Sequence, residues 1–303
     1  MRLDIKNLHK SFGKKEVLHG ISFSVESGTA VGLLGRNGAG KTTTIRILMD
    51  VFKADKGEIL LDGKPFEPRS VQIGYLPEER GLYPKKKVGE QIAYLAELRG
   101  MKAKDAKAAV RKWLARLQVA EYENAALETL SKGNQQKVQL AQTLVCDPQI
   151  VILDEPFSGL DPVNSQILKD VIVDEMHKGK IILFSSHQMS YVEEFCKDIL
   201  IINRGNAVLS GNLREVQREF GHNRLILSAV GMDHINLRNA VEEQLASLVT
   251  VDGNKGEQLI LKMKPHVNKR KVFAALSAGD LDVELFGDYQ PSLYDIFIKK
   301  AGD

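Results

Sequence analysis

The spacing of hydrophobic residues changes several times along the chain, and each spacing predicts a different element. In the first quarter, short strand-like stretches are expected at residues 2–8, 17–25, 30–34, 57–61 and 72–76. Between residues 88 and 117 the apolar positions instead recur every three to four residues. This second spacing predicts helix, with Trp113 on its buried face.

Two continuous apolar runs, at residues 150–153 and 181–184, predict buried strands, because a strand covered on both sheet faces carries no polar side. A helix-length segment at 162–178 separates them, and another helix is expected to begin at Ser131. Strand, helix and strand in this order favour a doubly wound α/β domain with an inserted helical block. We expect this domain to cover residues 1–220, with the helical block at about 85–147.

A different order of elements is predicted after residue 220. Strand, helix, strand, strand, helix and strand follow one another from residue 224 to residue 286, and a last amphipathic helix covers 292–300. The β-α-β-β-α-β order is typical of a ferredoxin-like unit. Residues 221–303 are therefore expected to form a small α+β accessory domain.

Composition narrows the functional classes. The 303 residues are 43% hydrophobic and 27% charged, as in a globular protein of about two domains. A net charge of +3 argues against nucleic acid as a partner. The apolar runs are far shorter than a membrane span, and the first residues lack a secretory signal, so we expect a cytoplasmic protein. Its two cysteines, Cys146 and Cys196, suggest no disulfide, and Cys146 is expected to be buried.

The clearest chemical signal is a glycine-rich loop between a predicted strand and a predicted helix. The loop matches G-x-x-x-x-G-K-[ST] at every fixed position and consists of Gly35, Arg36, Asn37, Gly38, Ala39, Gly40, Lys41 and Thr42. Its glycines let successive N–H groups point at phosphate oxygens, and the helix N-terminus adds partial positive charge. Lys41 is expected to reach the β- and γ-phosphates, and Thr42 to ligate Mg²⁺. Thr43 is also assigned to the nucleotide site.

Two carboxylates end the apolar run 150–153. Ligands of α/β sheets bind at the carboxyl ends of strands, where Asp154 and Glu155 stand. We expect Asp154 to help to hold Mg²⁺ and Glu155 to orient and polarise the attacking water. Alone, this pair would more simply cap a helix. Beside the glycine-rich loop, it predicts phosphoryl transfer.

Several further motifs stand in the order typical of one protein family. They are Ser131, Lys132, Gly133 and Asn134 at a helix start, Ser158, Gly159, Leu160 and Asp161 after the carboxylates, His187 after a strand, and Phe12 near the start of the chain. Together they resemble the signature, D-loop, switch histidine and adenine-stacking residue of ATP-binding cassette (ABC) ATPases. The resemblance covers about the first 215 residues and implies the ABC cassette fold, with an antiparallel β subdomain beside the helical one.

The resemblance also implies how such a protein works. Two cassettes, as a homodimer or a heterodimer, sandwich two ATP molecules. The phosphate loop of one chain then faces the residues 131–134 of the other. Glu155, His187 and Lys41 would be catalytic, the cofactors would be ATP and Mg²⁺, and hydrophobic permease subunits would carry the cargo. The chain would lie at the inner face of the cell membrane.

Three residues depart from the family pattern. Lys132 replaces the first signature glycine, Asn134 replaces a glutamine, and Glu78 stands where a glutamine usually contacts Mg²⁺ or the attacking water. A carboxylate at Glu78 could serve as a third metal ligand. The stretch 79–84 is expected to line the groove that receives a helix of the permease.

These patterns leave three functions open. The first is the motor of a transporter, with export favoured by the single cassette and its added C-terminal domain. The second is a soluble ABC ATPase acting on ribosomes or nucleic acid, although such chains usually carry two cassettes or a long coiled coil. The third is a nucleotide-binding regulator, against which Glu155 and His187 argue. The cargo would be selected by the membrane subunits and not by this chain. The region 221–303 is expected to serve dimer contact or regulation.

Overall fold

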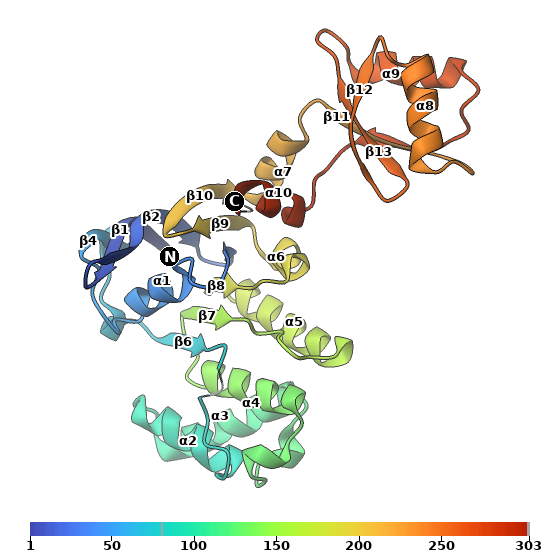
Figure 1. Cartoon of the computed structure of the whole chain (residues 1–303). Helices are drawn as coiled ribbons and strands as arrows, with labels where there is room; N and C mark the ends of the chain where they lie inside the picture. Colours follow the sequence, from blue (N-terminus) through green and yellow to red (C-terminus); the bar gives the residue numbers. More distant parts are fainter. Residues whose placement is uncertain (80, 302–303) are drawn as a thin grey trace. The chain divides into compact units, whose positions relative to one another are not determined.

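A computed structural model describes residues 1–79 and 81–301 (Figure 1). The chain divides into two compact units. The first contains residues 1–213 together with the segment that starts at Phe297, and the second contains residues 214–296. Each unit has its own sheet or sheets and its own hydrophobic core.

An antiparallel sheet opens the first unit. Its four strands, in the order β2-β1-β4-β5, are β2 (Lys15–Glu26), β1 (Arg2–Phe12), β4 (Lys56–Leu61) and β5 (Lys64–Pro65). Side chains that alternate along β1 and β2, such as Leu3, Ile5 and Ile21, are fully buried. This sheet is the antiparallel subdomain that the family resemblance implies.

The second sheet of this unit is mostly parallel. Its six strands, in order, are β10 (Asn206–Asn212), β9 (Asp198–Asn203), β3 (Ala30–Leu34), β8 (Ile181–Ser185), β7 (Ile150–Asp154) and β6 (Ile73–Leu76). All strands from β9 to β6 run parallel, and β10 is antiparallel to β9. Every residue of β3, β7 and β8 is buried. For β7 and β8 this confirms the buried strands predicted from the two apolar runs, and β3 is the strand expected at residues 30–34.

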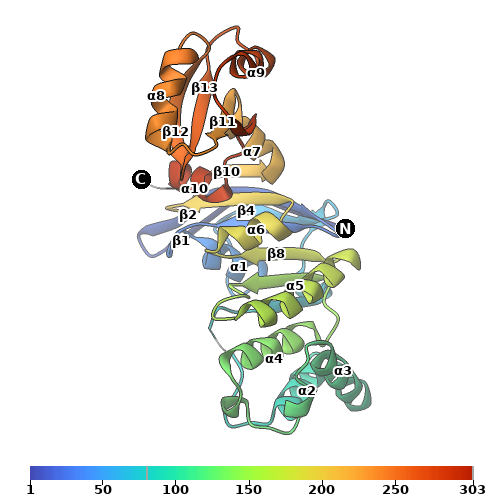
Figure 2. The same ribbon diagram turned by 90° about the vertical axis from the view of Figure 1, so that its right-hand side faces the viewer.

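Both faces of the parallel sheet are covered. On one face, α1 (Lys41–Leu48) and the antiparallel sheet share a core with alternate residues of β3, β7, β8 and β9. On the other face, the short helix α6 (Met189–Phe195) approaches β3 so closely that a Cβ at Gly32 would lie 2.5 Å from Val192 Cγ1. The helix α5 (Pro162–His177) lies beside β7 (Figures 1 and 2).

A group of helices separates β6 from β7 in the sequence. It contains α2 (Val88–Leu98), α3 (Ala103–Arg116) and α4 (Lys132–Leu144), with short 3₁₀ turns at Ala120–Tyr122 and Leu127–Thr129 and a further one at Pro68–Ser70 before β6. The helical spacing predicted over 88–117 is confirmed, but it forms two helices. Gly100, at φ 93°, occupies the left-handed conformation that reverses the chain between them. Trp113 is buried in this group, as expected.

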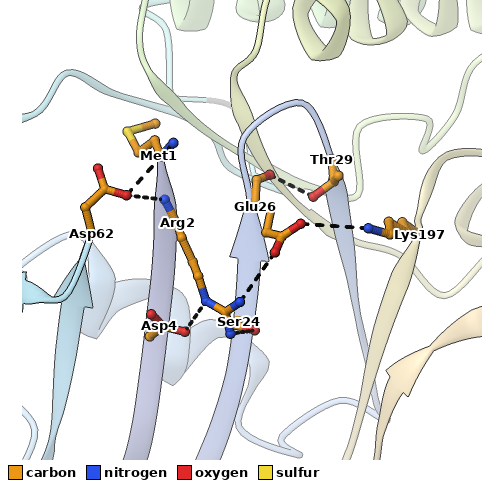
Figure 3. Close-up of polar contacts among 8 residues, drawn as sticks. All are labelled: Met1, Arg2, Asp4, Ser24, Glu26, Thr29, Asp62 and Lys197. Carbon is orange, nitrogen blue, oxygen red and sulfur yellow. Dashed lines mark hydrogen bonds and ion pairs between the residues drawn. The ribbon is translucent and has the colours of Figure 1, made fainter.

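Polar contacts fasten the first residues of the chain to their neighbours (Figure 3). The Arg2 side chain donates to Asp4 Oδ1 at 2.8 Å and to Ser24 Oγ at 3.2 Å, and its backbone N–H donates to Asp62 Oδ1 at 2.7 Å. Glu26 pairs with Arg2 at 3.4 Å and with Lys197 at 3.8 Å. Through Glu26 the antiparallel sheet is linked to the segment just before β9.

The second unit contains a single antiparallel sheet, against which the helices α8 and α9 pack. The elements from its start to its end are α7 (Leu213–Gly221), β11 (Arg224–Ala229), α8 (His234–Gln244), β12 (Val249–Lys255), β13 (Gln258–Met263), α9 (Lys269–Ala278), β14 (Val283–Asp288) and α10 (Leu293–Ala301), of which the part of α10 from Phe297 belongs to the first unit. The strand order β12-β13-β11-β14 confirms the predicted ferredoxin-like topology. Helix α8 buries Leu237 and Val241, and α9 buries Val272 and Leu276, in the same core.

Some expectations differ from the structure in detail. Helix α8 ends at Gln244, whereas the sequence pattern predicted helix as far as Leu248, and a turn occupies residues 245–248. Strand β12 runs to Lys255, beyond the predicted end at Val251. Strands β9 and β10 and helix α6 were not predicted. Cys146 is half-buried, and Cys196 is the buried cysteine, whose thiol pKa is raised by that burial. Among residues 1–79 and 81–301, no helix is long and apolar enough to cross a membrane.

Candidate functional site

The glycine-rich loop joins the end of β3 to the start of α1. Gly38 and Gly40 adopt positive φ values of 79° and 119°, which disfavour residues with a side chain. A Cβ on Gly35 would lie 2.5 Å from the carbonyl oxygen of Ile202, so the loop rests directly on the end of β9. Because the first turn of α1 has no acidic residue, the partial positive charge of its N-terminus is available to an anion.

Lys41 folds back over this loop. Its ammonium group donates to the carbonyl oxygen of Gly35 at 2.6 Å. Burial lowers the pKa of Lys41, while the negative charges of Glu155, Asp154 and Glu78 act in the opposite direction. The lysine therefore stands beside three carboxylates, where a phosphate could replace the carbonyl as its partner.

Asp154 is the last residue of β7 and is almost fully buried. Its Oδ1 accepts a hydrogen bond from Ser185 Oγ at 2.7 Å, at the end of the neighbouring strand β8. Burial, and next the charge of Asp154, raise the pKa of Tyr75 to about 12, which places the β6 hydroxyl in the same environment. The ends of three adjacent parallel strands thus meet around this carboxylate.

Glu155 follows in an unusual backbone conformation, with φ at 51°. Its carboxylate accepts hydrogen bonds from the His187 backbone N–H at 2.8 Å and from Ser186 Oγ at 3.2 Å. The ring Nδ1 of His187 also lies 2.9 Å from Glu155 Oε2. A left-handed conformation is strained for a glutamate, and such strain persists where the surroundings hold the residue firmly. Glu155 and His187, both predicted as catalytic, are therefore in direct contact.

Most of the predicted phosphate-site residues line one cavity of about 320 Å³. Its lining consists of Arg36, Asn37, Gly38, Gly40, Lys41, Thr42, Thr43, Glu78, Asp154, Glu155 and Val17. The carboxylates come from the end of β7, from the residue after it and from the segment after β6. The loop and the first turn of α1 supply the other polar residues, and Val17 comes from β2. Val17 was missed, because a valine within a predicted strand gives no chemical signal.

The residues of this cavity suit a magnesium ion. Thr42, Asp154 and Glu78 all line it and offer the oxygen ligands that Mg²⁺ prefers. In the part of the chain that the structure describes, no cluster of at least three His, Cys, Asp or Glu could hold a metal ion by itself. Mg²⁺ usually takes only one or two protein carboxylates and completes its shell with water and substrate phosphates.

The residues 131–134 form a separate group at the start of α4. Ser131 caps the helix, since its Oγ accepts from the Asn134 N–H at 3.3 Å. Gly133 faces α5, where a Cβ would lie 3.0 Å from Asn164 Nδ2. Asn164 in turn donates its backbone N–H to Asp161 Oδ1 at 2.9 Å.

The structure therefore brings the signature residues next to the predicted D-loop, whose residues Ser158, Gly159, Leu160 and Asp161 lead into α5. Within the described residues, neither group is among those that line the phosphate cavity. Lys132 and Ser131 are exposed at this helix start.

Phe12 lies at the end of β1, where 50% of its surface is exposed. It pairs with Lys15 across the hairpin that leads into β2, two residues before the cavity residue Val17. Its ring meets Phe52 edge to face, with centroids 5.3 Å apart. Phe52 was not predicted, because it comes from a segment with no motif.

A larger cavity, of about 480 Å³, lies beside β6, which contributes Ile73 and Tyr75 to its lining. Its lining includes Asp50, Arg69, Tyr75 and Arg99. The predicted docking stretch 79–84 begins three residues after β6, and Arg80 lies outside the described residues. Within that stretch Leu82 is buried and Tyr83 is 66% exposed.

Comparisons with known proteins agree on one family. A family model described as "ABC transporter" matches residues 18–158, and one described as "ATP-binding protein DrrA1-3-like, C-terminal domain" matches residues 211–301. An uncharacterized ABC transporter ATP-binding protein of Bacillus subtilis is 40% identical over 301 residues, or 99% of this chain and 98% of the relative.

A Nod factor export ATP-binding protein I of Paraburkholderia xenovorans is 32% identical over 309 residues, covering 99% of this chain and 97% of its own length. Among solved structures, the ATP-binding subunit of an ABC transporter superposes with a TM-score of 0.67 at 29% identity. That superposition covers 73% of this chain and 94% of the solved chain.

Proposed function

This chain belongs to the family of ABC transporter ATP-binding proteins, and from that premise we propose that its phosphate cavity binds MgATP and hydrolyses it to drive export. ATP binding and hydrolysis by such a subunit are the activity of the family. The assignment of individual residues, the dimer, the direction of transport and the permease contact are proposals. The contact between Glu155 and His187 beside Lys41 is the observation that carries the assignment.

In the proposed reaction, the glycine-rich loop and Lys41 hold the β- and γ-phosphates. Thr42 and Asp154, with Glu78 as a third ligand, would hold Mg²⁺, which when bound neutralises phosphate charge. Glu155 accepts a proton from the attacking water while the oxygen of that water forms a bond to the γ-phosphorus. The bond between the γ-phosphorus and the β–γ bridging oxygen breaks, so that ADP and inorganic phosphate leave. His187 keeps Glu155 in place and reaches the γ-phosphate.

A second cassette would complete the site. Ser131, Lys132, Gly133 and Asn134 present a capped helix start that has no acidic residue in its first turn, which suits an anion. Because these residues do not line the phosphate cavity of their own chain, we propose that they bind the ATP of another chain. The partner would be a second copy or a related cassette.

The membrane subunits would dock near the larger cavity. Arg69 and Arg99 line it beside Asp50, and the exposed Tyr83 lies in the adjoining stretch 79–84. A polar groove of this kind could receive a cytoplasmic helix of a permease, and the chain would then lie at the inner face of the membrane. The relatives named as Nod factor export proteins support export as the direction.

The test is Glu155→Gln, which keeps the shape of the side chain and removes its ability to accept a proton. ATP turnover should fall at least about 100-fold, because a general base typically contributes 10²–10⁴-fold. ATP binding should persist, and a dimer should accumulate with MgATP. Steady-state phosphate release and size-exclusion chromatography measure these two effects.

The exposed Glu128→Gln serves as a control of equal chemistry and should change neither quantity. Normal turnover in Glu155→Gln would refute the catalytic assignment. A monomeric Glu155→Gln chain that still binds MgATP would refute the proposed dimer.

A further inference from the structure

A cluster at the end of β1 has no part in the phosphate cavity. Phe12 and Phe52 pack edge to face, at an interplanar angle of 89°. Only Phe12 is strongly exposed, whereas Phe52 packs against the core of the first unit. One ring is thus presented to solvent and the other supports it from the protein side.

Lys10 lies against both rings. Its Nζ is 5.7 Å from the centroid of Phe12 and 5.6 Å from that of Phe52, within the range of a cation–π interaction. The Lys10 side chain is only 14% exposed, so its ammonium is held in place rather than free in solvent.

Asp55 holds this lysine and the strand end together. Its Oδ1 accepts from Lys10 Nζ at 2.7 Å, and its Oδ2 accepts from the Ser11 N–H at 2.6 Å. The Asp55 N–H donates back to the carbonyl oxygen of His9 at 2.8 Å. Three hydrogen bonds therefore fix the last residues of β1 to the segment that precedes β4.

We propose that Lys10, Phe52 and Asp55 are positioning residues that hold the Phe12 ring as a platform for the nucleobase. The inference rests on MgATP binding by this chain and on the stacking of the base on Phe12, which the family resemblance implies. Since the Lys10 ammonium lies against one face of the ring, the base must stack on the other face. Because Phe52 meets Phe12 edge to face, the tilt of that free face is fixed before nucleotide binds.

The arrangement also predicts a preference for purines. A cation on one face draws electron density from the ring, so the free face favours a large, electron-rich base. A platform that is already ordered loses little conformational entropy on binding. These effects act on the base alone and leave the phosphates untouched.

The experiment separates the contribution of the base to nucleotide affinity from the contribution of the phosphates. Dissociation constants are measured with Mg²⁺ for ADP, CDP and pyrophosphate, by competition against a fluorescent ADP analogue on the full chain. The ratio of the pyrophosphate constant to the ADP constant reports the contribution of the nucleoside. Phe12→Ala should lower this ratio about 10-fold, as expected for the loss of one stacked base.

Lys10→Met and Phe52→Leu should each lower the same ratio about 3-fold, with the pyrophosphate constant unchanged. An unchanged pyrophosphate constant also shows that the variant is folded around its phosphate loop. Lys10→Arg, which keeps the cation, should restore the ratio. Lys10→Met should also reduce the preference for ADP over CDP.

Lys53→Met is the matched control, because Lys53 pairs with Asp50 at 2.5 Å in the segment before Asp55. It should leave the ratio as it is in the unaltered chain. If Phe12→Ala lowers the ratio but Lys10→Met and Phe52→Leu do not, the positioning role is refuted. If Phe12→Ala itself has no effect, the stacking on Phe12 fails, and the inference fails with it.

Discussion

At the scale of single residues, two buried glutamates illustrate different uses of a buried charge. Glu155 faces a cavity and is held by His187 and Ser186, so its carboxylate can still reach a substrate. Glu175 is 1% exposed and is held by two lysines, Lys178 and Lys180. We propose that the first takes part in chemistry, while the second forms ion pairs within the fold.

Removing Lys180 should therefore be costly. Lys180→Met should lower the free energy of unfolding by about 3 kcal/mol, because it leaves the buried Glu175 without its buried partner. Urea unfolding followed by circular dichroism measures this loss. Lys178→Met is the control: Lys178 is 55% exposed, and its removal should cost less than about 1 kcal/mol. Equal losses in the two variants would contradict this interpretation.

Most residues that line the 320 Å³ cavity could be named from the sequence, because the motifs that contain them are local in sequence. The loop 35–42 is one continuous motif, and Asp154 and Glu155 are neighbours in the sequence. Most of these residues line one cavity in the structure. Phe52 and Lys10 could not be predicted in this way. Each is ordinary in its own segment, and their contact arises only when β1 meets the segment before β4.

At the scale of elements, length decides what could be predicted. The buried strands β7 and β8 were predicted because a continuous apolar run is a strong signal even when it is short. Helix α6 has only seven residues, about two turns, which is too short to show a helical period. The close packing of α6 on β3 instead explains the glycine at position 32, because a side chain there would occupy the space of the helix.

Filling that space should push the helix away. Gly32→Ala would bring a methyl group to 2.5 Å from Val192 Cγ1 and 3.3 Å from Cys196 Sγ. We expect a loss of about 1–3 kcal/mol, as for other overpacked cores, seen as a lower thermal midpoint. Gly253→Ala, in a strand with open space around the glycine, should be nearly neutral. An unchanged thermal midpoint in Gly32→Ala would mean that α6 can shift away from β3 without a loss of stability.

At the scale of the whole molecule, the chain is organised as a cassette and an accessory unit. The chain leaves the first unit after Leu213 and rejoins it at Phe297. Removing everything beyond residue 213 would therefore also remove a segment that belongs to the first unit. The role of residues 221–303 in dimer contact or regulation stays a proposal, motivated by their place after a complete cassette.

A clean deletion tests that role. Replacing residues 214–296 by a flexible glycine-serine linker of about 15 residues should leave ADP binding intact. It should weaken the dimer that MgATP induces in the Glu155→Gln background, as measured by analytical ultracentrifugation. A chain cut after Leu213 is the comparison and should be less stable than the linker variant. Unchanged dimerisation, ATPase rate and transport would refute the proposed role.

The topology of the ferredoxin-like sheet affects how easily this unit could be exchanged between proteins during evolution. Its first strand, β11, and its last, β14, are antiparallel neighbours, with Leu225 opposite Asp288. The chain therefore enters and leaves this unit at the same place. A gene fragment that encodes such a unit could be inserted at a single site of a host protein. Because the two ends of the unit are close together, the insertion would not force the flanking host residues apart. Exchange of this unit between related motors should thus be tolerated more readily than exchange of any segment of the cassette.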